Sequence, residues 1–109
     1  MNSSDAGARG ISGGDVVRVF NDRGATLVGV EISDYLRQGV IEVPTGAWYD
    51  PQMIGNQEVD VHGNPNAVTK DVGTSTIAQG CSAHSCLVEV ELFEDELPDI
   101  TAHSLPDFA

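Results

Sequence analysis

Two stretches of β-branched and apolar side chains near the N-terminus predict a β-hairpin. Residues 16–20 and 25–32 are both rich in side chains that favour strands. Residues 21–24, with the sequence NDRG, separate them and predict a tight turn, in which we expect Gly24 to adopt a positive φ. The second stretch offers Leu27, Val28, Val30 and Ile32 to a hydrophobic core.

Further along the chain, the pattern predicts two more short strands and little helix. Residues 40–43 predict a strand that ends before a proline, and residues 86–93 alternate Val and Leu with Glu, which is typical of a strand with one solvent-exposed face. Residues 2–5 resemble a helix cap, and one helical turn is expected at residues 6–9. We expect residues 52–60 to form a loop and residues 97–109 to form a surface tail.

Short strands, tight turns and little helix predict a mainly β domain, either a barrel or a sandwich. The chain has 109 residues, which is enough for one small domain with a modest core. We therefore expect residues 1–109 to form one domain, and the sequence contains no internal repeat.

Residues 62–86 form the most unusual stretch, because they combine glycines and small polar residues without the period of a helix or strand. Such a run between predicted strands favours a functional loop. Residues 64–66 are a turn signal, and residues 71–75 offer cap side chains for a short helix that ends at Gly80. Free N–H groups at such a helix start suit a phosphate. The alternative is a well-capped surface loop that binds nothing.

The charge of the chain excludes two classes of partner. Seventeen acidic and five basic side chains give a formal charge of −12, whereas nucleic acids and anionic membrane surfaces require clustered Lys and Arg. We therefore expect no nucleic-acid and no membrane partner. No apolar run reaches transmembrane length and no signal-peptide pattern is present, so we expect a cytoplasmic chain, although a longer parent enzyme could be periplasmic.

Neither a metal site nor a catalytic group is predicted. Cys81, His84 and Cys86 provide only three soft ligands, without a second pair at zinc-site spacing. Two cysteines do not make a disulfide framework either, and both are expected to be small buried apolar residues. No carboxylate pair and no Ser–His–Asp order rises above chance.

A set of motifs in one order resembles the C-terminal molybdopterin-dinucleotide-binding domain of the dimethyl sulfoxide reductase family. The closest branch is that of the biotin sulfoxide and trimethylamine N-oxide reductases. The motifs cover nearly the whole chain, and they are SDAxARGI at 4–11, GDVVRVFNDRG at 14–24, GV at 39–40, PTGAWYDP at 44–51, HGNPN at 62–66, Thr69, Asp71, GTS at 73–75, AQGC at 78–81, LVEVE at 87–91 and ELP at 96–98.

This resemblance implies a double-psi β-barrel, which could lack its first strands, and a bis(molybdopterin guanine dinucleotide) molybdenum cofactor bound with the other domains of an enzyme. Asn and Gln amides both donate and accept, so they can match the edge of a pterin, and bare main-chain N–H groups can hold oxyanions. Trp48 and Tyr49 are expected at the approach to the cofactor. The cofactor-binding residues that the resemblance implies are His62, Gly63, Asn64, Asn66, Thr74, Ser75, Gln79 and Gly80.

Two function hypotheses follow. The first is a cofactor-binding domain, or part of one, of a molybdenum-dependent S- or N-oxide reductase, in which case the isolated chain is expected to be inactive. The second is a free-standing small β-barrel that acts as a protein–protein interaction module, with a strand-swapped homodimer as one form of it.

Overall fold

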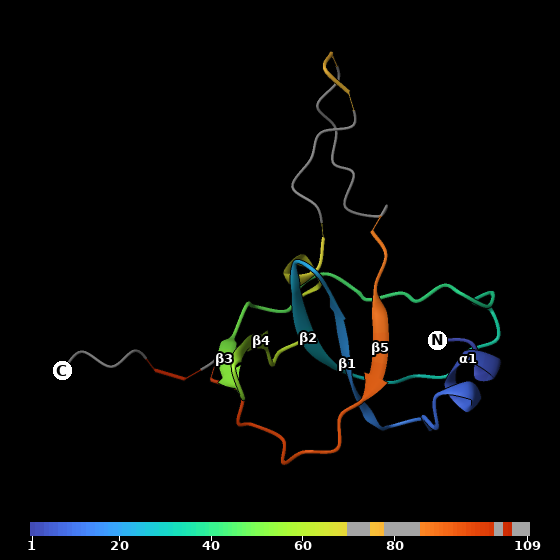
Figure 1. Cartoon of the computed structure of the whole chain (residues 1–109), viewed down its shortest axis with the longest axis horizontal. Helices are drawn as coiled ribbons and strands as arrows, with labels where there is room; N and C mark the ends of the chain where they lie inside the picture. Colours follow the sequence, from blue (N-terminus) through green and yellow to red (C-terminus); the bar gives the residue numbers. More distant parts are fainter. Residues whose placement is uncertain (70–74, 78–85, 102–103, 106–109) are drawn as a thin grey trace.

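A computed structural model describes residues 1–69, 75–77, 86–101 and 104–105. This part of the chain is mainly β, with one short α-helix and one 3₁₀ turn (Figure 1). In chain order the elements are α1 (Ser3–Ala8), β1 (Val16–Asn21), β2 (Gly24–Gly29), β3 (Pro51–Ile54), β4 (Gln57–Asp60), the 3₁₀ helix η1 (Pro65–Ala67) and β5 (Glu89–Leu92).

The predicted hairpin is confirmed. Strands β1 and β2 pair antiparallel from Val16 opposite Gly29 to Asn21 opposite Gly24, so only two residues form the turn. Our prediction for Gly24 is wrong, because Gly24 is not among the glycines with positive φ. The physical reason for a glycine here is close approach: a Cβ at Gly24 would lie 2.5 Å from the main-chain oxygen of Ala67.

The five strands form one open mixed sheet in the order β3-β4-β2-β1-β5 (Figure 1). Only β2 and β4 pair in parallel, with Thr26 opposite Asp60. At the edge, β5 pairs antiparallel with β1, so the predicted C-terminal strand is confirmed over Glu89–Leu92. At the opposite edge, β3 and β4 form a hairpin that turns at Gly55, with a φ of +62°.

Two predictions of secondary structure are wrong. Residues 52–60, expected as a loop, contain most of β3 and all of β4; the hairpin has few apolar side chains because one buried position is the carboxylate Asp60. Residues 40–43, expected as a strand, have no sheet partner, and Val40 is 39% exposed. The β-branched composition of residues 40–43 reflects packing instead, because Ile41 packs against a core cluster from outside the sheet.

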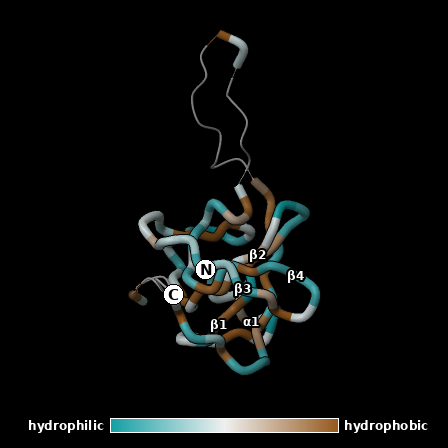
Figure 2. Tube along the Cα trace, turned by 90° about the vertical axis from the view of Figure 1, so that its left-hand side faces the viewer, coloured by the Kyte–Doolittle hydropathy of each residue, from teal (hydrophilic) through white to brown (hydrophobic). Residues whose placement is uncertain are grey.

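Apolar side chains cover both faces of the sheet. One cluster is centred on Val17 and Val19 of β1 with Ala6 of α1, and the other on Leu27 of β2 with Val59 of β4. Figure 2 shows hydrophobic and hydrophilic positions alternating along the tube through the body of the molecule. Adjacent residues of a strand point to opposite faces, so Leu27 and Val28 of β2 can both pack against a hydrophobic cluster.

The helix α1 starts earlier than the predicted turn at residues 6–9. Asn2 is its N-cap, and the side chain of Asn2 accepts a hydrogen bond from the Ser4 N–H at 2.8 Å. The helix ends before Gly10, which has a φ of +68°. It is six residues long, and no helix in the described ranges has the length and apolar character needed to cross a lipid bilayer.

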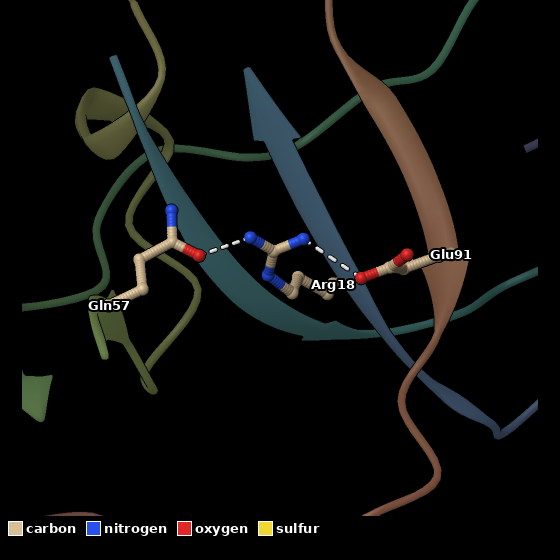
Figure 3. A network of polar contacts seen from close by, with 3 residues as sticks. All are labelled: Arg18, Gln57 and Glu91. Atoms are coloured by element: carbon tan, nitrogen blue, oxygen red, sulfur yellow. Dashed lines mark hydrogen bonds and ion pairs between the residues drawn. The ribbon is translucent and has the colours of Figure 1, made fainter. Parts of the chain in front are cut away.

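Arg18 connects three strands through one guanidinium group (Figure 3). Its Nη1 donates to Glu91 Oε1 of β5 at 2.8 Å, and its Nη2 donates to Gln57 Oε1 of β4. Its Cζ lies 4.1 Å from the centre of the Phe20 ring, which adds a cation–π contact. Arg18 therefore ties β4 and β5 to β1 across one face of the sheet.

Candidate functional site

The candidate site is built at the end of β4, where Asp60 leads into the bend formed by residues 62–66. Asp60 is only 1% exposed, and its carboxylate accepts hydrogen bonds at both oxygens. Oδ2 accepts from the Thr26 hydroxyl at 2.6 Å and from the Asn64 N–H at 2.6 Å. Oδ1 accepts from the Asp50 N–H at 2.8 Å and from the His62 N–H at 3.4 Å. Asp60 therefore anchors the 62–66 bend to the sheet.

Gly63 makes the sharp reversal within the 62–66 bend. Its φ is +85°, a conformation that is costly for any residue with a Cβ. A Cβ at this position would also lie 3.3 Å from Val28 Cγ1, so the bend lies directly against β2. Both observations require glycine at position 63.

The imidazole of His62 has a defined tautomer. Its Nδ1 lies 2.8 Å from the main-chain oxygen of Trp48, and a carbonyl oxygen can only accept. Nδ1 therefore carries a hydrogen. This hydrogen bond also joins the aromatic segment around Trp48 to the 62–66 bend.

The two asparagines of the bend use their side-chain oxygens to stabilise the loop itself. Asn64 Oδ1 accepts from the Asn66 N–H at 2.9 Å and so caps η1. Asn66 Oδ1 accepts from the Thr69 hydroxyl at 3.5 Å. The amide nitrogens of Asn64 and Asn66 make no hydrogen bond to any other described residue.

A cavity of about 510 Å³ lies beside the bend. Its lining includes His62 and Gly63, residues 42–45 with Ala47, and residues 27–29 at the end of β2. Residues 97, 98 and 100 line it from the C-terminal part of the chain. The bend therefore borders a concave surface through His62 and Gly63, whereas Asn64 and Asn66 are not among the lining residues.

The C-terminal wall of this cavity is held by Asp50, which is 4% exposed. Its carboxylate accepts from the Thr101 N–H at 2.5 Å and from the Thr101 hydroxyl at 2.7 Å. Gln52 Nε2 donates to the main-chain oxygen of Asp99 at 2.6 Å. Part of the stretch expected as a surface tail is thus hydrogen-bonded to the segment that enters β3.

Trp48 and Tyr49, expected at the approach to a cofactor, are 65% and 52% exposed. The Tyr49 hydroxyl donates to Glu58 Oε1 at 3.0 Å. This hydrogen bond, with a smaller effect of burial and of the negative charges of Glu58 and Asp60, raises the pKa of Tyr49 above its ordinary value of 10.0.

Three of the predicted site residues, Thr74, Gln79 and Gly80, lie outside the described residues. Ser75 is described, and its hydroxyl oxygen accepts a hydrogen bond from the Ile77 N–H at 3.3 Å. The structure thus brings together four of the eight predicted residues, His62, Gly63, Asn64 and Asn66, in one bend.

Metal binding finds no support in the described part of the chain, where His, Cys, Asp and Glu form no group of three or more that could hold an ion. Of the cysteine–histidine cluster weighed above, Cys81 and His84 fall outside the described residues, and Cys86 is a half-buried free cysteine.

Three residues to which the sequence analysis assigned no role at the site organise it, although Asn21 and Asp50 lie within the family motifs at 14–24 and 44–51. Asp60 and Asp50 are described above, and Asn21 is the third. Its Nδ2 donates to the main-chain oxygen of Val68 at 2.8 Å and to that of Leu87 at 3.0 Å. Asn21 therefore holds together the two ends of the polar run that connects η1 to β5. The only sequence signal was acidic and amide side chains beside predicted strands, which is too common to be specific.

Comparisons with known proteins identify the family of the chain. Residues 1–87 match the family described as "Molydopterin dinucleotide binding domain". Trimethylamine-N-oxide reductase of Salmonella typhimurium is 47% identical over 107 residues, which are 97% of this chain. Trimethylamine-N-oxide reductase 1 of Escherichia coli K12 is 48% identical over 102 residues, and the Vibrio cholerae reductase is 45% identical over 106.

The chain spans about 13% of the length of the curated relatives it matches. The match to the family extends over α1, all of β1 to β4 and the 62–66 bend. The family that the sequence motifs resembled is thereby confirmed, and this chain belongs to the molybdopterin dinucleotide-binding domain family.

Proposed function

We propose that this chain binds the guanine dinucleotide form of molybdopterin within a molybdenum-dependent enzyme that reduces S- or N-oxides. The observation that carries the proposal is the 62–66 bend beside the cavity, in a chain that belongs to a dinucleotide-binding family. Relatives named trimethylamine-N-oxide reductase favour an N-oxide as the substrate of the whole enzyme.

The chemistry of the bend suits a flat heterocycle with polar edges. Asn64 and Asn66 each have an amide nitrogen that takes no part in the described hydrogen bonds and can donate to such an edge. A cavity of about 510 Å³ lies within the usual size range for small-molecule sites. It accommodates one part of a dinucleotide rather than the whole of a bis(dinucleotide) cofactor, so the rest must be bound elsewhere.

Charge supports a shared site. A chain with a formal charge of −12 disfavours a diphosphate, and the 62–66 bend contains no Lys or Arg. The cations that balance the diphosphate then come from the remaining domains of the enzyme, which are the principal partners that we propose. Thr74, Ser75, Gln79 and the main-chain N–H of Gly80 are proposed to complete the contacts from this chain.

Within the whole enzyme, the molybdenum centre supplies two-electron chemistry that removes an oxygen atom from the substrate. The residues of this chain bind and orient the dinucleotide and exclude water from one side of it. The chain by itself is proposed to be inactive. A double-psi barrel is the proposed fold of the complete domain, and homodimerisation through exposed sheet edges stays a prediction that light scattering at several concentrations tests.

The test compares two asparagines that cap short helices in the same way. In the assembled enzyme, Asn64→Ala and Gln79→Ala are expected to lower the amount of dinucleotide that remains bound after purification, measured as extracted pterin. Asn2→Ala is the control, because Asn2 caps α1 in the same manner at a distance from the bend. Equal retention in Asn64→Ala, Gln79→Ala and the control contradicts the proposed site.

A further inference from the structure

We propose that Asp60 is a positioning residue for the dinucleotide, and that its role requires a carboxylate rather than any other hydrogen-bonding side chain. This inference rests on the proposed function, because it assigns Asp60 a part in binding only through the 62–66 bend. Asp60 is 1% exposed, so it acts through the main chain of His62 and Asn64 instead of touching the ligand itself.

The surroundings of the Asp60 carboxylate consist of donors. Main-chain N–H groups of Asp50, His62 and Asn64 and the hydroxyl of Thr26 all point at its two oxygens. Three of these four groups are N–H donors that cannot accept, so a side chain at this position must accept at both atoms. The two oxygens of a carboxyl group do so without leaving a donor unpaired.

Asparagine has nearly the same shape but fails this requirement in either orientation. If its amide nitrogen replaces Oδ2, it faces the Asn64 N–H, although the Thr26 hydroxyl can turn and accept. If it replaces Oδ1, it faces the Asp50 N–H, and the aromatic segment before β3 loses its anchor. The first orientation leaves the Asn64 N–H unpaired, and the second leaves both the Asp50 and the His62 N–H unpaired, so Asp60→Asn releases part of the bend in either case.

The bend in turn determines where the proposed ligand-binding groups lie. The hydrogen bond from the Asn64 N–H to Asp60 fixes the position of Asn64, whose side chain caps η1. The hydrogen bond from the His62 N–H to Asp60 fixes the position of His62, whose ring contacts the Trp48 oxygen. Asp60 therefore controls the amides of Asn64 and Asn66 and the imidazole of His62 together, in a way that no single ligand-contacting residue does.

The experiment has two readouts on Asp60→Asn. Amide hydrogen exchange in the full chain reports the N–H groups of Asn64, Asp50 and His62 directly, and extracted pterin reports dinucleotide retention in the assembled enzyme. We expect either the Asn64 N–H or the Asp50 and His62 N–H groups to exchange about tenfold faster or more, according to which oxygen the amide nitrogen replaces, and retention to fall with them. Asp22→Asn is the matched control: it makes the same chemical and charge change at an exposed position in the β1–β2 turn.

The outcomes separate this inference from the proposed function. Faster exchange at Asn64, or at Asp50 and His62, with lower retention supports both. Faster exchange with unchanged retention supports the structural role of Asp60 but overturns its role in binding, and with it the proposed site. Unchanged exchange at all three of these N–H groups overturns the inference whatever happens to retention, since Asp60 then does not hold the bend, while the proposed function is unaffected.

A second pair of variants decides the matter if Asp60→Asn does not fold. Thr26→Val removes the hydroxyl that donates to Asp60 Oδ2 and leaves the three N–H groups in place. The carboxylate then has fewer constraints, so we expect severalfold faster exchange of the Asn64 N–H, whereas Thr26→Ser, which keeps the hydroxyl, leaves it protected. Equal exchange in the two variants contradicts the positioning role.

Discussion

Single polar side chains at this site satisfy several partners at once. Asp60 accepts from four donors, and the Asn21 amide donates to two carbonyl oxygens while its own oxygen accepts from the Arg23 N–H at 2.9 Å. Burying a polar group is costly unless it is hydrogen-bonded. Among the described residues, no buried side-chain nitrogen or oxygen lacks a partner, so these groups order the loops without a net penalty of that kind.

Tyr49 gives a prediction that depends on pH. Its raised pKa means that the folded state favours the protonated phenol, so this contribution to stability is fully present below pH 10.0 and is lost as the pH rises through the folded-state pKa. In a Tyr35→Phe background, ultraviolet absorbance reports Tyr49 alone, and we expect a titration midpoint above 10.0. Adding Glu58→Ala should lower the midpoint, and a midpoint unaffected by Glu58→Ala would count against the Tyr49–Glu58 hydrogen bond.

Asp34 gives a prediction at the opposite end of the pH range. The Ser3 hydroxyl and the Ser3 N–H donate to Asp34 at 2.6 and 3.1 Å, and they lower the pKa of this exposed carboxyl below its ordinary value of 3.8. The associated stabilisation is present above pH 3.8 and is lost as the pH falls through the folded-state pKa. Carboxyl chemical shifts followed by NMR should show a low midpoint for Asp34 that returns towards the ordinary value in Ser3→Ala.

At the level of elements, the β1–β2 hairpin and η1 can lie close together because Gly24 has no side chain. A Cβ on Gly24 would meet the Ala67 oxygen, whereas nothing lies within 4 Å of the Cβ position of Gly29 in the same strand. We expect Gly24→Ala to lower the free energy of unfolding by about 1–3 kcal/mol, the usual cost of overpacking. Gly29→Ala is the control for strand glycines.

Thermal and denaturant unfolding of both variants measure this effect. Gly24→Ala should either displace η1 together with the start of the polar run, or move the β1–β2 turn away from η1. If the two variants unfold alike, the contact between Gly24 and Ala67 does not constrain the fold.

Asn21 is expected to stabilise the connection between η1 and β5. Asn21→Asp replaces the amide donor with an oxygen that faces the carbonyl oxygens of Val68 and Leu87. Loss of both bonds is expected to cost about 1–3 kcal/mol of unfolding free energy, and proteolysis within the polar run should accelerate. Asn56→Asp, in the exposed β3–β4 turn, makes the same charge change, so equal stability of the two variants is the contradicting result.

Local patterns in the sequence were enough for some elements and not for others. The β1–β2 hairpin and β5 are predictable because β-branched runs and apolar–acidic alternation express their own burial. The β3–β4 hairpin is not predictable in this way, because the buried residue Asp60 is a carboxylate and interrupts the apolar–polar alternation that indicates a strand. The 62–66 bend was predicted from its turn residues and family motifs. Its anchor Asp60 combines near contacts, to His62 and Asn64, with a distant one to Thr26, and Asp50 and Asn21 contact residues far away in sequence, which no local pattern encodes.

At the scale of the whole molecule, the site combines segments from most of the chain. The cavity is bordered by β2, residues 42–47, the 62–66 bend and the C-terminal wall that Asp50 holds. The sheet is open, the chain is strongly acidic, and it covers about 13% of its relatives' length. These properties suit a domain that presents one side of a cofactor site to the rest of an enzyme.

The most direct test of the central claim, that the 62–66 bend binds the dinucleotide, compares two glycines with the same backbone conformation. Gly63 and Gly14 have φ of +85° and +87°, so an alanine at either position carries a similar backbone cost, about 1–2 kcal/mol, and only at Gly63 does the added Cβ also press on Val28 Cγ1, at 3.3 Å. Dinucleotide content of the purified, assembled enzyme is the measurement. We predict that Gly63→Ala loses most of the bound dinucleotide while Gly14→Ala, matched in backbone conformation, retains it. Equal dinucleotide content in the two variants would contradict the account.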